Sequence, residues 1–101
     1  MALDYKGIYN LWRANGEIEA RVKVALVKYA QYLKALGAGA TANQQTWCNS
    51  ALKLDSQVDG DAEQAMKYVA TDATTLSTDG VLTDAQLQTI VENWVNTVLL
   101  V

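Results

Sequence analysis

The side chains that most often carry out chemistry are scarce in this chain. Histidine, the usual general base near neutral pH and the commonest metal ligand, is absent, and Cys48 is the one cysteine. Neither a zinc site nor a Cys–His nucleophile pair can be assembled from these residues. The three serines lack the context of a nucleophile elbow. Glu17 and Glu19, two apart on a predicted helix, point in different directions and make a poor acid and base pair.

Two segments imitate calcium-binding loops. In the first, around Asp59 and Gly60, the final ligand position falls on Met66, which cannot bind calcium. In the second, around Gly80, it falls on Gln86 in place of the bidentate glutamate that calcium loops use. We interpret both segments as turns and helix caps. The sequence therefore predicts a non-enzymatic protein with no catalytic residues, no metal site and no cofactor.

Composition also bears on nucleic acids and membranes as partners. The net charge of −3 and the pI near 4.7 argue against non-specific binding to either, because both depend on a concentrated excess of Lys and Arg. The best candidate for a DNA-recognition helix carries Arg21, Lys23, Lys28 and Lys34 on more than one face. No apolar run approaches the ~20 residues that cross a bilayer. We expect no specific nucleic-acid partner and no membrane.

Glycines and helix caps divide the chain into predicted elements. A first short helix covers about 4–14, capped by Asp4 and ending at Asn15-Gly16. A second covers 17–36. A third begins at a Thr-Ala-Asn-Gln capping box at 41–44 and runs to about 54. After a polar link over 56–60, a fourth helix begins at Asp61. A loop over 71–80 precedes a second capping box at 83–86, which opens a fifth helix.

Apolar residues recur at helical spacing in these segments. In the second helix they lie three and four residues apart from Ile18 to Leu36, whereas Val24 and Val27 fall outside this stripe. Trp47 is predicted on the inner face of the third helix. The inner faces of the third and fifth helices also include Leu54, Trp94 and Val98. The expected fold is all-α, a compact bundle of four to five helices in one domain over 1–101, its main part at about 17–98.

The amino-terminal aromatic residues allow two interpretations. Tyr5, Tyr9 and Trp12 share the short first helix, and Arg13 lies beside them. A domain of this size has limited room to bury three large rings, and Tyr, Trp and Arg are enriched at protein–protein contacts. These four residues are therefore candidate interface residues, with burial in the core as the alternative.

The carboxyl end has a similar ambiguity. Val98, Leu99, Leu100 and Val101 present apolar side chains on every side of the last turn. Either the chain's own core or a neighbouring subunit can cover them. We include Leu99, Leu100 and Val101 among the candidate interface residues.

Charge is distributed unevenly along the chain. Residues 1–50 carry six basic and three acidic side chains, a net charge of +3. Residues 51–101 carry two basic and eight acidic side chains, a net charge of −6. The two halves can pair within one protomer, or the basic face of one copy can pair with the acidic face of the next.

Part of the sequence resembles small helical structural proteins encoded by tailed bacteriophages, over roughly 17–97. The residues that carry the resemblance are Arg21-Val22, Ala25, Lys28-Tyr29-Ala30, Ala40-Thr41-Ala42-Asn43, Trp47, Thr83-Asp84-Ala85-Gln86-Leu87-Gln88, Val91, Val95 and Asn96. This chain has Asn43-Gln44 where such proteins typically have Asn-His.

The resemblance implies a structural subunit of the virion, made in the host cytoplasm. It points to a head–tail connector or completion subunit arranged in a ring, in contact with copies of itself and with portal, tail or capsid proteins. A capsid decoration protein is the next possibility. A small phage regulator that binds DNA or a host factor is the alternative from another class.

Overall fold

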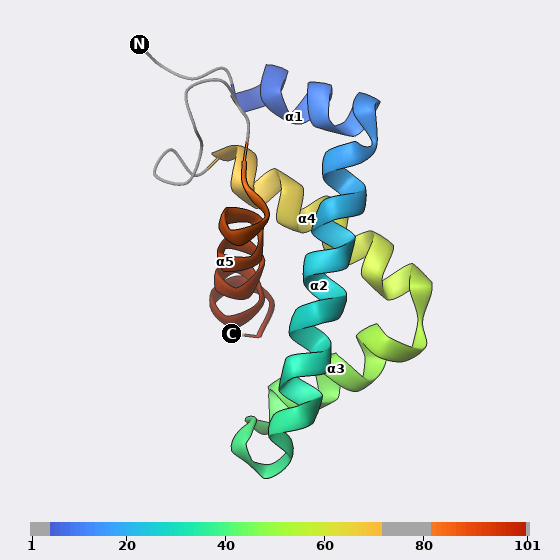
Figure 1. The fold of residues 1–101 in the computed structure, drawn as a ribbon, viewed down its shortest axis with the longest axis vertical. Helices are drawn as coiled ribbons and strands as arrows, with labels where there is room; N and C mark the ends of the chain where they lie inside the picture. The colour runs from blue at the N-terminus through green and yellow to red at the C-terminus, as the bar shows by residue number, and fades with distance from the viewer. Residues whose placement is uncertain (1–4, 72–81, 101) are drawn as a thin grey trace.

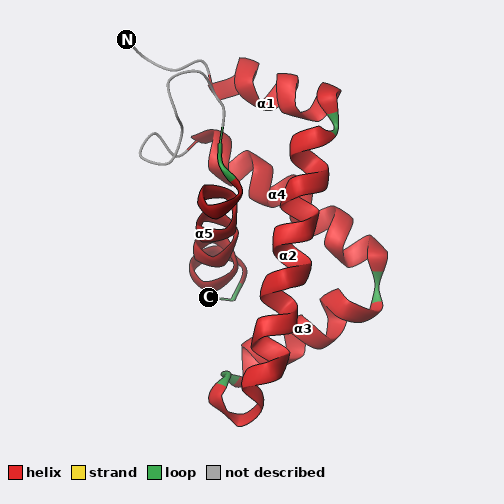
Figure 2. Ribbon diagram, in the orientation of Figure 1, coloured by secondary structure: helices red, strands yellow, loops and turns green. Residues whose placement is uncertain are grey.

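The computed structural model describes residues 5–71 and 82–100, and these residues form helices (Figures 1 and 2). They contain five α-helices and no strand, which confirms the predicted all-α bundle of four to five helices. The helices are α1 (Tyr5–Asn15), α2 (Glu17–Leu36), α3 (Ala42–Lys53), α4 (Asp55–Thr71) and α5 (Asp84–Trp94). A short 3₁₀ helix, η1 (Gly37–Gly39), follows α2, and a π-helical turn, η2 (Val95–Leu99), extends α5.

Helix α2 is the central element of the bundle, because it contacts each of the other four α-helices and packs against them more extensively than any other helix described. Figure 1 shows α1 lying across the amino-terminal end of α2, α3 near its other end, and α5 running alongside it. Its buried face carries the predicted stripe from Ile18 to Leu33, whereas Leu36, the last residue of the prediction, is 40% exposed at the end of the helix. The helical period of this stripe is therefore the feature around which the other helices pack.

Two glycines end helices as the sequence predicts. Gly16, between α1 and α2, has a φ of 74°, and Gly37, after α2, has a φ of 55°. Residues with a Cβ rarely adopt these left-handed conformations, so glycine allows the chain to turn at both points.

The two predicted capping boxes are both present. The hydroxyl of Thr41 accepts a hydrogen bond from the backbone N–H of Gln44, whose side chain accepts one from the backbone N–H of Thr41. Thr83 and Gln86 form the same reciprocal pair at the start of α5. Each box satisfies two backbone donors that the first turn of a helix leaves without partners.

The predicted start of the fourth helix is wrong. Helix α4 begins at Asp55, so the expected link over 56–60 is helical, and Asp61 lies inside the helix. Val58, in the expected link, is buried. The carboxylate of Asp61 is also buried and accepts a hydrogen bond from the indole of Trp47, so it is held by a neighbouring helix and does not cap its own.

One hydrophobic core joins all five α-helices. Trp47 and Trp94 are both buried in it, as predicted. Leu54 and Val98, predicted to face inward, are 55% and 51% exposed. Leu54 follows the last residue of α3 and is not part of its inner face. Val98 lies in η2, where the N–H of Leu100 reaches back five residues to the carbonyl of Val95 at 2.8 Å. This wider turn changes the 3.6-residue spacing on which the prediction depended.

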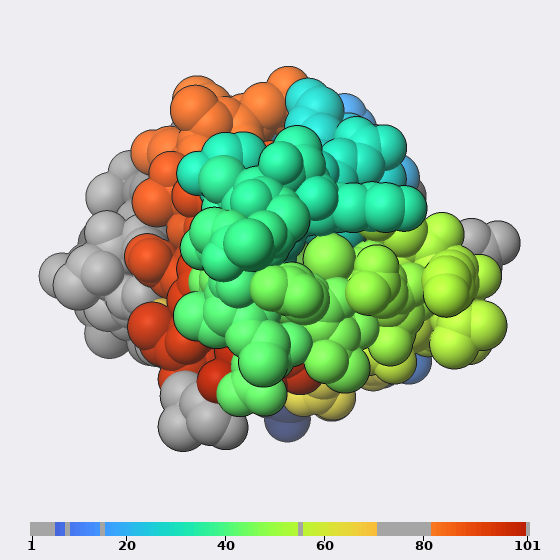
Figure 3. Space-filling model, turned by 90° about the horizontal axis from the view of Figure 1, so that it is seen from below, coloured from blue at the N-terminus to red at the C-terminus, as the bar shows by residue number. Residues whose placement is uncertain are grey.

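Hydrogen bonds hold η2, the turn that extends α5, against α2 and α3. The side-chain amide of Asn96 donates to the hydroxyl of Tyr29 on α2, and its oxygen accepts a hydrogen bond from Gln44 on α3 at 2.9 Å. Figure 3 shows the same end of the molecule from below, where the last turns of α2, helix α3 and the carboxyl-terminal residues lie together.

Candidate functional site

The candidate interface residues on α1 lie against α4. Tyr9 is half-buried, and its hydroxyl donates a 3.5 Å hydrogen bond to Oε1 of Glu63 on α4. The Nη1 atom of Arg13 lies 3.8 Å from the same oxygen. Both residues therefore help to hold α1 on its own protomer. The side chain of Tyr5 lies outside the described residues.

Trp12 belongs to the hydrophobic core, with 4% of its surface exposed. Of the two interpretations of this residue, the structure supports the core. Helix α1 contacts both α2 and α4, and this packing provides the room to bury one large ring. The packing of α1 on these two helices could not be predicted from the sequence. Trp12 is therefore buried within its own protomer, and the core alternative holds for this residue in place of the interface.

The candidate residues at the carboxyl end contact the protein's own core. Leu99 and Leu100 are half-buried and pack against the core, and Val101 lies outside the described residues. Together with Trp47, Leu99 and Leu100 line a shallow pocket of about 330 Å³. A partner could contact only the exposed parts of these side chains.

The charged halves of the sequence are paired within the protomer at three points. Arg21 on α2 binds Asp84 on α5, with Nη2 2.8 Å from Oδ1, and also donates to the backbone carbonyl of Leu82 at 2.6 Å. Lys23 lies 2.7 Å from Asp59 on α4. The Arg13–Glu63 pair is the third. These pairs support the within-protomer alternative, because each joins a base from residues 1–50 to an acid from residues 51–101.

The ion pair with Asp59 also changes the pKa of Lys23. The hydrogen bond to Asp59 raises the pKa of Lys23 above its ordinary value of 10.5. The charges of Asp59 and Glu19 act in the same direction, and desolvation partly opposes them. The ammonium group is therefore charged across the physiological pH range, and it serves to join α2 to α4.

Other potential reactive groups are separated or buried. The described residues contain no group of three or more Cys, Asp or Glu side chains that could hold a metal ion. Asp59 and Gly60 lie within α4, so this segment is not a calcium-type loop. Cys48, whose Sγ lies 3.2 Å from the carbonyl oxygen of Gln45, is 2% exposed. Within the described ranges, no helix is long and apolar enough to cross a membrane.

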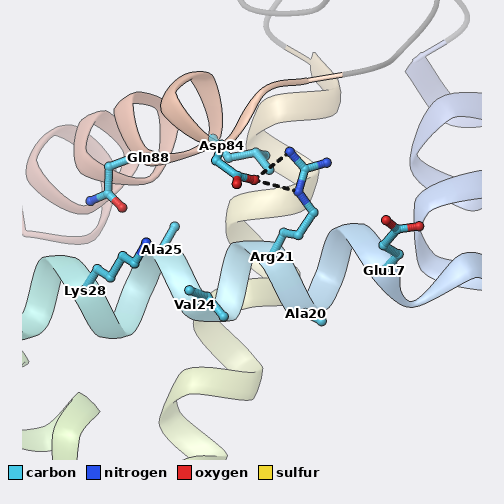
Figure 4. Close-up of a pocket in the computed structure, with 9 residues that line it drawn as sticks. Glu17, Ala20, Arg21, Val24, Ala25, Lys28, Asp84 and Gln88 are labelled. Atoms are coloured by element: carbon cyan, nitrogen blue, oxygen red, sulfur yellow. Dashed lines mark hydrogen bonds and ion pairs between the residues drawn. The ribbon is translucent and has the colours of Figure 1, made fainter.

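A groove between α2 and α5 is a candidate contact site (Figure 4). Its volume is about 360 Å³. The residues that line it are Glu17, Ala20, Arg21, Val24, Ala25 and Lys28 from α2 and Asp84, Leu87 and Gln88 from the α5 side.

The groove combines apolar side chains with charged ones. Figure 4 shows Glu17 at one end and Lys28 at the other, with the Arg21–Asp84 pair between them. Neither Glu17 nor Lys28 forms an ion pair with any residue that the structure describes. Val24 is 54% exposed. This arrangement suits the docking of an apolar side chain flanked by one base and one acid.

Other large apolar side chains are exposed outside the groove. Leu11 on α1 is 64% exposed and Tyr32 on α2 is 57% exposed, with its ring stacked on that of Tyr29 at a centroid distance of 6.0 Å. Neither residue was among the interface candidates predicted from the sequence. For the groove, one signal was available in the sequence, namely the position of Val24 outside the buried stripe of α2.

No protein-family model, curated protein sequence or solved structure matches this chain.

Proposed function

We propose that this protein is a non-enzymatic assembly subunit that acts by contacting other protein chains. The observation that carries the proposal is the exposure of large apolar side chains on the protomer, among them Leu11, Val24 and Tyr32 on α1 and α2. Large apolar side chains that remain in water in the protomer lose that contact when a partner covers them. The groove beside Val24 provides a concave surface for such a partner.

Within this class, we propose a structural subunit of a tailed-bacteriophage virion, in a head–tail connector or completion ring. The resemblance over residues 17–97 supports this more specific role. Arg13, Arg21 and Lys23, three bases of the amino-terminal half, are paired with acids of the carboxyl-terminal half within the protomer. The ring contact in this proposal therefore depends mainly on the exposed apolar side chains, with portal, tail or capsid proteins as the other partners. A capsid decoration protein would use the same surfaces.

The alternative function, a small regulator that binds DNA, has less support from the contacts of the basic residues on α2. Of the four basic residues on its candidate recognition helix, Arg21 and Lys23 are held by Asp84 and Asp59. Lys28 and Lys34 remain to contact DNA phosphates. Two lysines are few for a DNA-binding surface, which must neutralise several phosphates. A salt-dependent mobility shift with duplex DNA would favour the regulator over the assembly subunit.

The proposed function is tested by measuring the mass and shape of the assembly and by locating the chain in virions. Native mass spectrometry and negative-stain images of the purified protein should show closed rings, and an antibody should detect the chain in purified virions. The variant Leu11→Ser should reduce ring formation without changing the helical circular dichroism signal. A protein that stays monomeric at high concentration and is absent from virions would refute the proposal.

A further inference from the structure

The groove between α2 and α5 has a charge pattern that is complementary to itself. Glu17 and Lys28 lie on the same face of α2, eleven residues apart, which is roughly 16 Å along the helix axis. Between them lie Ala20 and Val24, which also line the groove. When a copy of this face is turned by 180°, its base meets the acid of the first copy and its acid meets the base.

We propose that a second copy of this chain docks here, with the two α2 helices antiparallel about a two-fold axis near Ala20 and Val24. Glu17 of each copy then pairs with Lys28 of the other, so the contact contains two equivalent ion pairs. The small side chain of Ala20 allows the helices to approach closely, and Val24 is transferred from water into the apolar part of the groove.

Charge complementarity selects a second copy as the occupant. The occupant must carry a base and an acid about three helical turns apart, with small apolar side chains between them, and α2 itself has this pattern. Arg21 does not oppose the pairing, because Asp84 already neutralises it. Because the two-fold axis passes between Glu17 and Lys28, Lys28 of one copy lies opposite Glu17 of the other copy and not opposite its Lys28.

This two-fold contact goes beyond the proposed function: it covers Val24 and the groove, whereas Leu11 and Tyr32 lie outside the groove and remain for the ring contact. A ring closes through head-to-tail contacts between two different surfaces, whereas this contact joins two copies of one surface. The α2 contact can therefore be absent while the rings remain, or present in a protein that forms no rings.

The test is a charge exchange followed by analytical ultracentrifugation. In Glu17→Lys alone or Lys28→Glu alone, both ion pairs become repulsive, so each variant should dimerise about tenfold more weakly than the wild type. An equimolar mixture of the two variants should form heterodimers with near wild-type affinity, because each end again joins a base to an acid. The double variant should recover homodimers for the same reason.

Two controls separate this contact from effects on folding. Lys34→Glu makes the same charge change on α2 but outside the groove, and should leave dimerisation unchanged. Circular dichroism of every variant checks that α2 remains folded, and recovery in the mixture cannot arise from a folding defect. A wild type that stays monomeric, single variants that dimerise as well as the wild type, or a mixture that does not recover would each overturn the proposal.

Discussion

The indole Nε1 of Trp47 on α3 donates a 2.8 Å hydrogen bond to Oδ2 of Asp61 on α4. Gln57, one turn earlier on α4, donates to both oxygens of the same carboxylate at 3.0 and 3.1 Å. Asp61 is the buried charged residue within the described part of the chain, with 6% of its surface exposed. The hydrogen bonds offset the cost of removing this carboxylate from water and fix the packing of α3 on α4.

Replacing Asp61 should therefore destabilise the protein. We expect Asp61→Ala to lower the free energy of unfolding by about 1–3 kcal/mol, because the buried N–H of Trp47 loses its acceptor. Asp61→Asn, which keeps an acceptor oxygen, should cost less. Urea denaturation followed by circular dichroism measures both values. Equal losses in the two variants would mean that the hydrogen bond contributes little.

Gly16 and Gly60 should respond to alanine in opposite directions. Gly16 has a φ of 74°, so Gly16→Ala should cost about 1–2 kcal/mol, although a Cβ there meets no atom within 4 Å. Gly60 lies within α4, where a Cβ also meets no atom within 4 Å. Gly60→Ala should stabilise the protein by about 0.5–1 kcal/mol, because it restricts the unfolded chain. Thermal melting of both variants tests the difference in sign.

The Lys23–Asp59 pair predicts a dependence of stability on alkaline pH. Because the folded protein raises the pKa of Lys23, the pair contributes fully below the ordinary value of 10.5. Its contribution is lost as the pH rises through the raised pKa of the folded state. Asp59→Asn removes the main cause of the shift, so the stability difference between wild type and variant should shrink above pH 10.5. Urea titrations from neutral to alkaline pH measure this difference, and a constant difference would contradict the prediction.

Substitutions at Leu11 and Trp12, which are neighbours on α1, should distinguish an effect on folding from an effect on assembly. Trp12→Ala removes a buried ring and should lower the free energy of unfolding by about 3–5 kcal/mol. Leu11→Ser changes a side chain that is 64% exposed and should alter stability by less than about 0.5 kcal/mol. Chemical denaturation measures both effects. If Leu11→Ser destabilised the protomer as strongly as Trp12→Ala, Leu11 would be a folding residue and would no longer support an assembly surface.

Local signals in the sequence were sufficient for much of the fold. The bounds of α2 and both capping boxes depend on apolar spacing, glycine and side chains within a few residues of each other. The start of α4 was missed because the polar residues before Asp61 look like a link and Gly60 looks like a helix breaker. The burial of Val58 helps to keep this segment helical, and so does the hydrogen bond between Asp61 and Trp47, fourteen residues away. Such contacts override local propensity.

The candidate site was less predictable for the same reason. Tyr9 and Arg13 were recognised as polar and aromatic residues of one helix, but their shared partner Glu63 lies about fifty residues further along the chain. The groove beside Val24 exists only because α5 lies against α2. Spacing within α2 indicated that Val24 was not part of the main stripe. It did not indicate that Glu17 and Lys28 would mark the two ends of a concave surface.

The burial of Cys48 gives the protein a natural reporter of its own motion. Because it is the one thiol in the chain and is 2% exposed, a small alkylating reagent reaches it only after α3 separates from the core. The rate of alkylation therefore measures how often the folded protein opens in this region. A partner that clamps α3 in place would slow the reaction, so that binding could be followed without attaching any label.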